Sequence, residues 1–274
     1  KVLKLESHIY AARYVQTIKF ATKKFMDAGM ENAISRLYGS GEINNTDVFF
    51  TLMEFSKNKP LFLRSRSGKI WPNYFKAWVI PVLQQFHERN GIVLMSGSEW
   101  SKVLCAKFEE KQLPSAMQKA FNSCTQRLNN ADKIIMPMGM IHGDLQPQNV
   151  HFSNGCCTLM DWSNTKNSAL ITDVVCDVFY KAMREPDLES SLEYWHFING
   201  EISLNDCSSS LVGLSQVWFG WMNQWHELMY DESDLRMQLE AACWDWLGTM
   251  IHPWKSNNEL WPHIRFPDCY LKNS

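Results

Sequence analysis

The sequence lacks both a long apolar run and an excess of charge of one sign. Its 274 residues contain 27 Lys and Arg against 29 Asp and Glu, which gives a formal net charge of −2. This balance leaves no basic surface for nucleic acid or for an anionic membrane. No apolar stretch reaches the roughly 20 residues that a membrane-spanning helix needs, and no signal peptide is visible. We therefore expect a soluble protein without a membrane span or a nucleic-acid partner.

Cysteine pairs with metal-binding or redox spacing are also absent. The eight cysteines form no Cys-x-x-Cys pair, and several of them lie inside apolar stretches. Free thiols in a reducing compartment fit this pattern better than a disulfide framework does, so a cytoplasmic location is expected. The length allows one large domain or two lobes, with ample core to bury.

The residues that carry chemistry are concentrated in one stretch, Ile141-His-Gly-Asp-Leu-Gln-Pro-Gln-Asn149. A strand-like run follows it, then an Asn-Gly hairpin turn signal and a returning run over residues 156–160. A tight hairpin fixes its two ends relative to each other. The loop before the hairpin, with Asp144 and Asn149, and the loop after it, with Asp161, should therefore face one point. Oxygen atoms of carboxylate and amide groups suit Mg²⁺.

This arrangement resembles the catalytic core of the protein-kinase-like fold, and more closely that of the aminoglycoside phosphotransferase and choline kinase family. The family's His-Gly-Asp-Leu-x-x-x-Asn loop corresponds to residues 142–149 here, and its Ile-Asp-Trp segment corresponds to Met160-Asp161-Trp162. The resemblance implies that Asp144 is the catalytic base and that Asn149 and Asp161 hold Mg²⁺. It also implies that His142 braces the loop by hydrogen bonding. The alternative is a Gly-Asp turn beside an unrelated carboxylate.

The first strand-like run, residues 1–5, contains Lys4. The resemblance implies that Lys4 pairs the phosphates of ATP, and the alternative is a solvent-facing lysine on a half-buried strand. A helix is expected to follow over residues 7–26. In the family this helix supplies a Glu to the lysine, but residues 8–25 contain no acidic residue, and Gln16 is only a neutral substitute.

A glycine-rich loop that covers the phosphates should precede this strand in the family, and none stands before Lys1. Such a loop supplies backbone donors to the phosphates. The sequence leaves open whether the chain is a fragment of a longer protein.

Two further strands are expected, over residues 34–38 and 47–55, with a turn region containing Gly-Ser-Gly and Asn-Asn between them. The second strand ends in a segment that looks like the hinge between kinase lobes. There the backbone at Glu54 would hydrogen-bond the adenine edge, while Met53 and Phe55 would pack against its flanks. The alternative is an apolar strand with a polar end.

The next part of the sequence is expected to contain a connector over residues 57–72 and then helices. A helical pattern covers residues 73–89, where Pro81 is expected to introduce a kink. His87, near the end of this helix, is interpreted as a structural residue. Another helical stretch covers residues 99–130 and is divided by Pro114.

After Asp161 the sequence has no Ala-Pro-Glu segment and no long Ser/Thr/Tyr-rich activation loop. This absence favours a small-molecule kinase over a protein kinase, because no segment is available to dock a peptide. The resemblance places a helix start at Asp177-Val-Phe179, where Asp177 would cap the helix. Asp173 is interpreted as a residue that orients a turn or a basic partner.

The last third of the chain, residues 186–274, is helical in pattern and holds most of the twelve Trp. Most of these aromatic residues are expected to form a helical core. The family walls its acceptor site with acidic and aromatic residues from this region, which would suit a cationic acceptor or a saccharide. Glu193, Asp245 and Trp246 are the candidates.

Together these patterns predict an α+β, protein-kinase-like bilobal fold. Residues 1–56 would form the remaining part of a small, β-containing N-terminal lobe, and residues 57–274 a large, mainly helical C-terminal lobe. The predicted function is Mg-ATP-dependent phosphoryl transfer to a hydroxyl of a small molecule, sugar or saccharide. The alternatives are an atypical protein kinase and a catalytically silent binding module. The sequence does not fix the acceptor or the oligomeric state.

Overall fold

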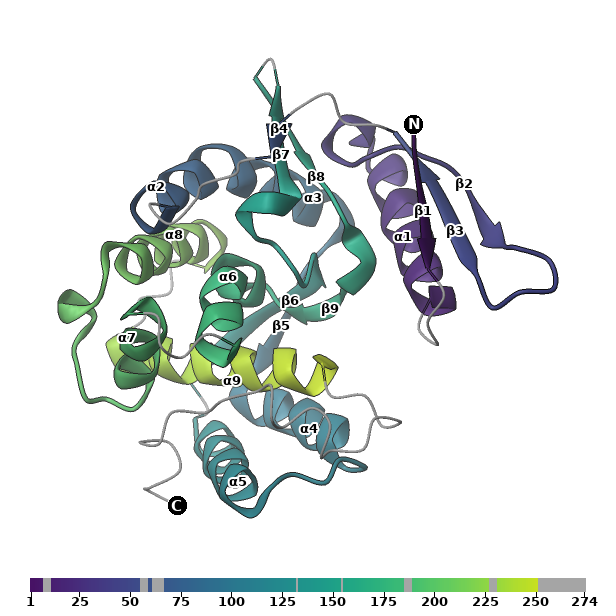
Figure 1. Cartoon of the computed structure of the whole chain (residues 1–274). Helices are drawn as coiled ribbons and strands as arrows, with labels where there is room; N and C mark the ends of the chain where they lie inside the picture. The colour runs from purple at the N-terminus through teal and green to yellow at the C-terminus, as the bar shows by residue number, and fades with distance from the viewer. Residues whose placement is uncertain are drawn as a thin grey trace.

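The computed structural model describes residues 1–6, 11–54, 59–60, 67–131, 133–153, 155–184, 189–226 and 231–250. A small β-rich N-terminal part lies beside a larger, mainly helical C-terminal part (Figure 1). The predicted α+β class with a β-containing first part is therefore confirmed. None of the described helices is both long and apolar enough to cross a membrane.

The N-terminal part is a three-stranded antiparallel sheet covered by one helix. Its strands, in spatial order, are β1 (Val2–Glu6), β3 (Phe49–Met53) and β2 (Leu37–Glu42). Helix α1 (Ala11–Asp27) buries a row of apolar side chains at helical spacing. At its C-terminal end, the Phe25 ring stacks on Phe86 at 4.3 Å and meets the edge of Trp162 at 4.8 Å. These contacts fix the helix to the C-terminal part.

The strand predicted at residues 34–38 lies further along the chain than expected. Strand β2 runs straight through Gly39-Ser40-Gly41, which the sequence pattern assigned to the turn. Pairing with β3 satisfies the backbone of this glycine-containing segment, with a register shift between Leu37 and Gly39. The turn itself lies between β2 and β3, where Asn45 has a positive φ of 61°.

The C-terminal part contains two further three-stranded sheets. In one, β6 (Ile135–Ile141) lies between β5 (Val93–Ser96) and β9 (Lys166–Ala169), all antiparallel. In the other, β7 (Val150–Ser153) lies between β4 (Lys59–Pro60) and β8 (Cys156–Leu159). The predicted hairpin is the β7–β8 pair, in which Val150 faces Leu159. Both sheets end next to residues 142–149.

Eight helices pack around these sheets in the described residues of the C-terminal part (Figure 1). Pro114 separates α4 from α5 as predicted, since it directly precedes α5. Helix α6 begins six residues before Asp177, so the prediction that Asp177 caps this helix is wrong and Asp173 lies in the first turn instead. The helices are α2 (Ser67–Tyr74), α3 (Ile80–Asn90), α4 (Gly97–Phe108), α5 (Ser115–Asn129), α6 (Ile171–Arg184), α7 (Glu189–Ile198), α8 (Ser209–His226) and α9 (Glu232–Met250).

The predicted connector at residues 57–72 is partly helical, because α2 begins at Ser67 and contains Pro72. Tertiary packing outweighs the helix-breaking tendency of this proline: a Cβ atom on Gly213 of α8 would lie only 2.7 Å from the Pro72 side chain. A π turn over Phe75–Val79 then joins α2 to α3. The π turn places Pro81 in the first turn of α3, where its missing N–H costs little.

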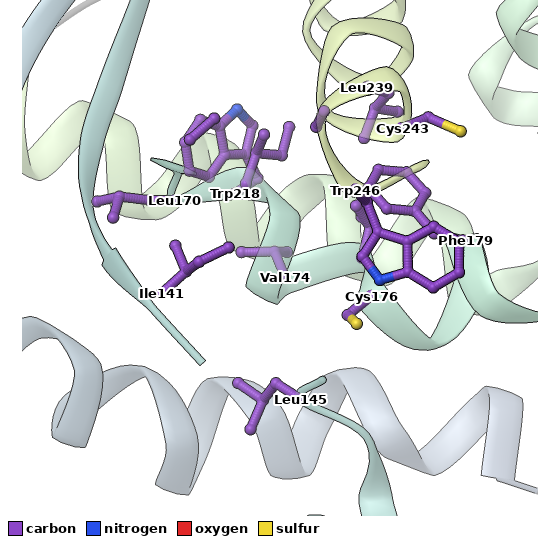
Figure 2. Close-up of a cluster of buried hydrophobic side chains, with 14 of the residues drawn as sticks. Ile141, Leu145, Leu170, Val174, Cys176, Phe179, Trp218, Leu239, Cys243 and Trp246 are labelled. Carbon is purple, nitrogen blue, oxygen red and sulfur yellow. The ribbon is translucent and has the colours of Figure 1, made fainter. Parts of the chain in front are cut away.

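Many aromatic side chains of the C-terminal part lie in its hydrophobic core, as the sequence predicted. Trp195, Trp218 and Trp244 are each at most 2% exposed. Figure 2 shows one cluster in which side chains of α6, α8 and α9 meet the residues that flank the stretch 142–144. Its labelled members are Ile141, Leu145, Leu170, Val174, Cys176, Phe179, Trp218, Leu239, Cys243 and Trp246.

Candidate active site

The β7–β8 hairpin brings together two loops, which we call the Asp144 loop (residues 142–149) and the Asp161 loop (residues 160–165). Two hydrogen bonds join them directly. The backbone N–H of Met160 donates to the carbonyl of Asn149 at 2.8 Å, and Nε2 of His142 lies 2.6 Å from the carbonyl oxygen of Met160. His142 is fully buried, and burial lowers its pKa to about 4. His142 is therefore neutral and joins the two loops, and the bracing role stays a prediction.

Asp144 is held by two amide side chains from its own loop. Nε2 of Gln146 donates to Asp144 Oδ1 at 2.8 Å. Nδ2 of Asn149 donates to the Asp144 carbonyl at 2.7 Å and to its Oδ2 at 3.2 Å. Burial raises the pKa of Asp144 to about 6, against the opposing effect of these hydrogen bonds. The arrangement yields an oriented carboxylate that can accept a proton near neutral pH.

Asp161 lies at the start of the Asp161 loop in a left-handed backbone conformation, with φ 56° and ψ 64°. Oδ1 accepts a hydrogen bond from Ser163 Oγ at 2.8 Å. Oδ2 lies 3.8 Å from Nζ of Lys4, which reaches across from β1. These two side chains are 43% and 37% exposed, so the pair is open to solvent and to a ligand.

Asp173, which the sequence did not place in the site, anchors the backbone of the Asp144 loop. Both carboxylate oxygens of Asp173, in α6, accept hydrogen bonds from backbone N–H groups of His142 and Gly143. Asp173 is buried, which raises its pKa to about 7 against the effect of the two donors. The sequence interpretation that Asp173 orients a turn is consistent with this geometry, but sequence spacing gave no sign that the turn is the Asp144 loop.

The two loops approach each other so closely at Gly143 that no side chain fits there. Gly143 has a φ of 81°, and a Cβ atom on it would lie 2.3 Å from the carbonyl oxygen of Asn164. Glycine is therefore required by its backbone conformation and by the available space.

The predicted adenine-binding residues are only partly described. Met53 ends β3, and Glu54 follows it. The Glu54 N–H donates to the Arg36 carbonyl at 2.8 Å, and its carbonyl accepts from Ser35 Oγ at 3.2 Å. The Glu54 carbonyl therefore keeps one lone pair for an adenine amino group, whereas its N–H is already used. Phe55 lies outside the described residues.

Among the described residues of α1, no acidic side chain replaces the missing Glu. The only acidic residue of this helix is Asp27, at its last position, and Gln16 is exposed. Lys4 does form an ion pair with Asp161.

The three candidates for the acceptor wall all make contacts within the fold. Asp245 is 1% exposed and makes ion pairs with Lys107 and Lys166. Trp246 is 5% exposed within the core cluster of Figure 2. Glu193 accepts a hydrogen bond from the Ser208 N–H at 2.8 Å, just before α8. The prediction that Asp245 and Trp246 wall the acceptor site is wrong, because both are buried and Asp245 is already bonded.

The donor set suits Mg²⁺ in the form that ATP-dependent enzymes use. No group of three or more His, Cys, Asp or Glu side chains in the described part of the chain could hold a metal ion by itself. Mg²⁺ is usually bound by one or two protein oxygens together with substrate phosphates. Asp161 and the amide oxygen of Asn149 could supply these, since Asn149 directs its nitrogen toward Asp144.

No family model matches the sequence, and no curated protein matches it. Solved structures do match. The alignment with an aminoglycoside-3'-phosphotransferase of type VIII has 12% identity and a TM-score of 0.50, and covers 89% of this chain and 83% of that one. The alignment with the amicoumacin kinase hAmiN, in complex with AMP-PNP, Ca²⁺ and Ami, has 14% identity and a TM-score of 0.50, and covers 99% and 80%. The choline kinase LicA from Streptococcus pneumoniae aligns with 14% identity and a TM-score of 0.45 over 89% and 85%.

The first two similarities show the fold. The chain has the bilobal protein-kinase-like fold of the aminoglycoside phosphotransferase type, which is the fold that the motifs predicted.

Proposed function

We propose that the protein transfers a phosphoryl group from Mg-ATP to a hydroxyl of a small molecule, sugar or saccharide. Residues 1–56 would cover the nucleotide and residues 57–274 would carry the catalytic and acceptor groups. The observation that carries the proposal is the position of Lys4, whose Nζ lies 3.8 Å from Asp161 Oδ2. This contact brings Lys4, the only cationic residue of β1, to the carboxylate expected to hold the metal.

In the proposed reaction, Asp161 and Asn149 would hold Mg²⁺, which would supply neutralisation of the charge on the transferred phosphoryl group. Lys4 would bind the phosphates, the Glu54 carbonyl would accept from the adenine edge, and Met53 would pack against its flank. Asp144 orients the acceptor hydroxyl and takes its proton. Because its pKa is about 6, Asp144 is mostly ionised at neutral pH and remains basic enough to accept a proton.

The nucleotide site is tested by thermal unfolding with and without Mg-ATP. Ligand at about a hundred times its dissociation constant should add roughly 2.7 kcal/mol to the free energy of unfolding, which is several degrees for a domain of this size. The shift should require Mg²⁺ and be lost in Asp161→Ala, but remain in Asp27→Ala, which removes an exposed carboxylate from α1. An equal shift in Asp161→Ala would contradict the assigned metal site.

Chemistry is tested separately with Asp144→Asn. ATP consumption in the presence of an acceptor should fall by at least about 100-fold when the proton acceptor is removed, while the Mg-ATP shift should persist.

A catalytically silent, kinase-like binding module is the second candidate. The lack of an acidic residue in α1 until Asp27 favours it, because Lys4 then has no helix carboxylate to orient it. Such a module would show no turnover for Asp144→Asn to remove.

A further inference from the structure

A cluster of three lysines surrounds Asp245 on the side of the C-terminal part formed by β9, α4 and α9. Nζ of Lys166 lies 2.7 Å from Asp245 Oδ2, and Lys107 forms an ion pair with Oδ1 of the same carboxylate. The Lys111 ammonium donates to the carbonyl of Lys107. We call Lys107, Lys111 and Lys166 the lysine cluster. Figure 1 shows that α4 and α9 lie side by side below β6 and β9.

The lysine cluster contains more ammonium groups than carboxylates in contact with them. Among the described residues, Asp245 is the only carboxylate that forms ion pairs with these ammonium groups. The exposed Glu110 acts on Lys111 and the buried Asp173 acts on Lys166, both without an ion pair. Burial and the charge of Lys107 lower the pKa of Lys111, and the same two causes lower the pKa of Lys166 to about 8. An ammonium group with an ammonium neighbour in a partly buried site is stabilised by an added anion.

The lysine cluster is next to the Asp144 loop. Lys166 pairs with Ile141 in the β6–β9 ladder, and the Thr165 hydroxyl donates to the Ile141 carbonyl at 2.7 Å. Only two residues lie between Ile141 and Asp144, so the Cα atoms of these residues are at most about 11 Å apart. The Lys166 charge also acts on Asp173, which holds the Asp144 loop.

The lysine cluster is also distinct from the cation assigned to the nucleotide. Lys4 reaches Asp161 from β1 in the N-terminal part, whereas the lysine cluster belongs to elements of the C-terminal part. The side chains of Lys107 and Lys166 are 23% and 15% exposed, so they are mostly buried but each keeps a small surface open to solvent. A cationic acceptor would meet three ammonium groups here, because the Asp245 carboxylate is already paired with two of them.

We propose that the lysine cluster binds an anionic group of the acceptor, a carboxylate or a phosphate monoester, and so places the acceptor hydroxyl at Asp144. The inference rests on the proposed function and names its substrate class: a small hydroxylated molecule that also carries a negative charge. This class replaces the cationic acceptor that the sequence suggested for Asp245.

Binding is measured first, with inorganic phosphate as the probe. Phosphate is titrated against the full chain at constant ionic strength, with saturating Mg-ADP present, and thermal unfolding is followed. Phosphate should stabilise the protein, and its half-saturation concentration should rise at least about 10-fold in Lys107→Gln and Lys111→Gln. Lys107→Arg, which keeps the charge, should restore binding. Lys111→Gln removes no ion pair of Asp245, so it separates lost binding from lost folding.

Lys102→Gln is the matched control, because Lys102 is an exposed lysine of the same helix α4. Phosphate stabilisation should be unchanged in this variant. Equal phosphate stabilisation in wild type, Lys107→Gln and Lys111→Gln would overturn the proposal, and so would the absence of stabilisation in the wild type.

Acceptor preference is measured next, by ATP consumption with Mg²⁺ and four alcohols that differ in charge. Glycerate and glycerol 3-phosphate carry the two anionic groups, while glycerol is neutral and choline is cationic. Turnover should be faster with glycerate or glycerol 3-phosphate than with glycerol or choline. The faster of the two anionic alcohols shows whether the lysine cluster binds a carboxylate or a phosphate monoester. Lys107→Gln should raise the KM for that alcohol more than it lowers kcat. Faster turnover of glycerol or choline would overturn the proposal.

The two proposals fail in different ways. An equal Mg-ATP shift in wild type and Asp161→Ala would contradict the assigned metal site and does not involve the lysine cluster. If the Mg-ATP shift is present and phosphate binding is the same in wild type and the lysine variants, only the proposed acceptor class is wrong. If phosphate binding requires the lysines and Mg-ATP has no effect, the phosphotransferase proposal is wrong.

Discussion

Asp173 accepts a hydrogen bond from the backbone N–H of His142, which lies 2.6 Å from its Oδ2. The other oxygen of this carboxylate, Oδ1, accepts the next N–H of the Asp144 loop, from Gly143, at 2.9 Å. Asp173 lies in the first turn of α6, where the helix dipole favours a negative charge. The loop that carries Asp144 is therefore anchored to the start of a helix rather than to the sheet from which it emerges.

Asp173→Asn should misplace Asp144. Asparagine keeps one acceptor oxygen but turns an NH₂ group toward one of the two backbone donors, so the Asp144 loop loses one of its two hydrogen bonds to α6. ATP turnover should show a kcat at least about 10-fold lower. Asp27→Asn changes an exposed aspartate and should leave kcat unchanged. A wild-type kcat in Asp173→Asn would show that the two hydrogen bonds do not hold the loop.

Gly143→Ala should inactivate the protein, whereas Gly155→Ala should not. Both glycines have φ near +80°, but the Cβ at Gly143 would lie 2.3 Å from the Asn164 carbonyl oxygen, while nothing lies within 4 Å of a Cβ at Gly155. Both variants carry the backbone strain of a positive φ, which costs about 1 kcal/mol. Any larger effect of Gly143→Ala is therefore due to the close approach of the two loops. Circular dichroism melts and ATP turnover of the two variants make the comparison. Equal effects would show that only the positive φ matters.

Asp144→Asn should make the protein more stable at pH 7.5 while it removes activity. The folded pKa of Asp144, about 6, is above its ordinary value of 3.8, so the folded state binds more protons than the unfolded state between these pH values. The free energy of unfolding therefore falls as pH rises through this window, by about 2–3 kcal/mol. Asparagine avoids that loss. Urea denaturation should show a gain of about 2 kcal/mol at pH 7.5 and none below pH 4.

His87 should make the fold sensitive to acid. It is buried, Nε2 lies 3.0 Å from the Met140 carbonyl, and burial lowers its pKa from 6.5 to about 4. The unfolded state then binds more protons, so the free energy of unfolding decreases by about 3 kcal/mol as pH falls from 6.5 to 4. His87→Gln can keep the hydrogen bond without titrating, and its unfolding free energy should change less over this range. An unchanged pH dependence would assign the acid sensitivity to other groups.

The sequence predicted the centre of the site because its residues are neighbours along the chain. Asp144, Asn149 and Asp161 are separated by one short hairpin, and the hairpin carries its own turn signal. Local rules were therefore sufficient to place them on two adjoining loops. The same reasoning predicted the break between α4 and α5 at Pro114.

The parts that sequence reasoning missed depend on contacts between distant segments. Asp173 is 31 residues from His142, and Lys107 is 138 residues from Asp245. No spacing rule connects such pairs. For the same reason Asp245 was interpreted as an acceptor-binding acid, although two lysines from other elements occupy its carboxylate.

The π turn over Phe75–Val79 determines which face of α3 each following side chain occupies. A π turn contains about one residue more than an α turn, and each residue of an α-helix advances about 100° around the axis. Deleting one residue from this turn would rotate Leu83, Phe86 and His87 by that angle, away from the core. The aromatic contact between Phe86 and Phe25, which joins the N-terminal helix to the rest of the molecule, would be lost with them. Chain length within one helical turn therefore controls how the two parts of the molecule are joined.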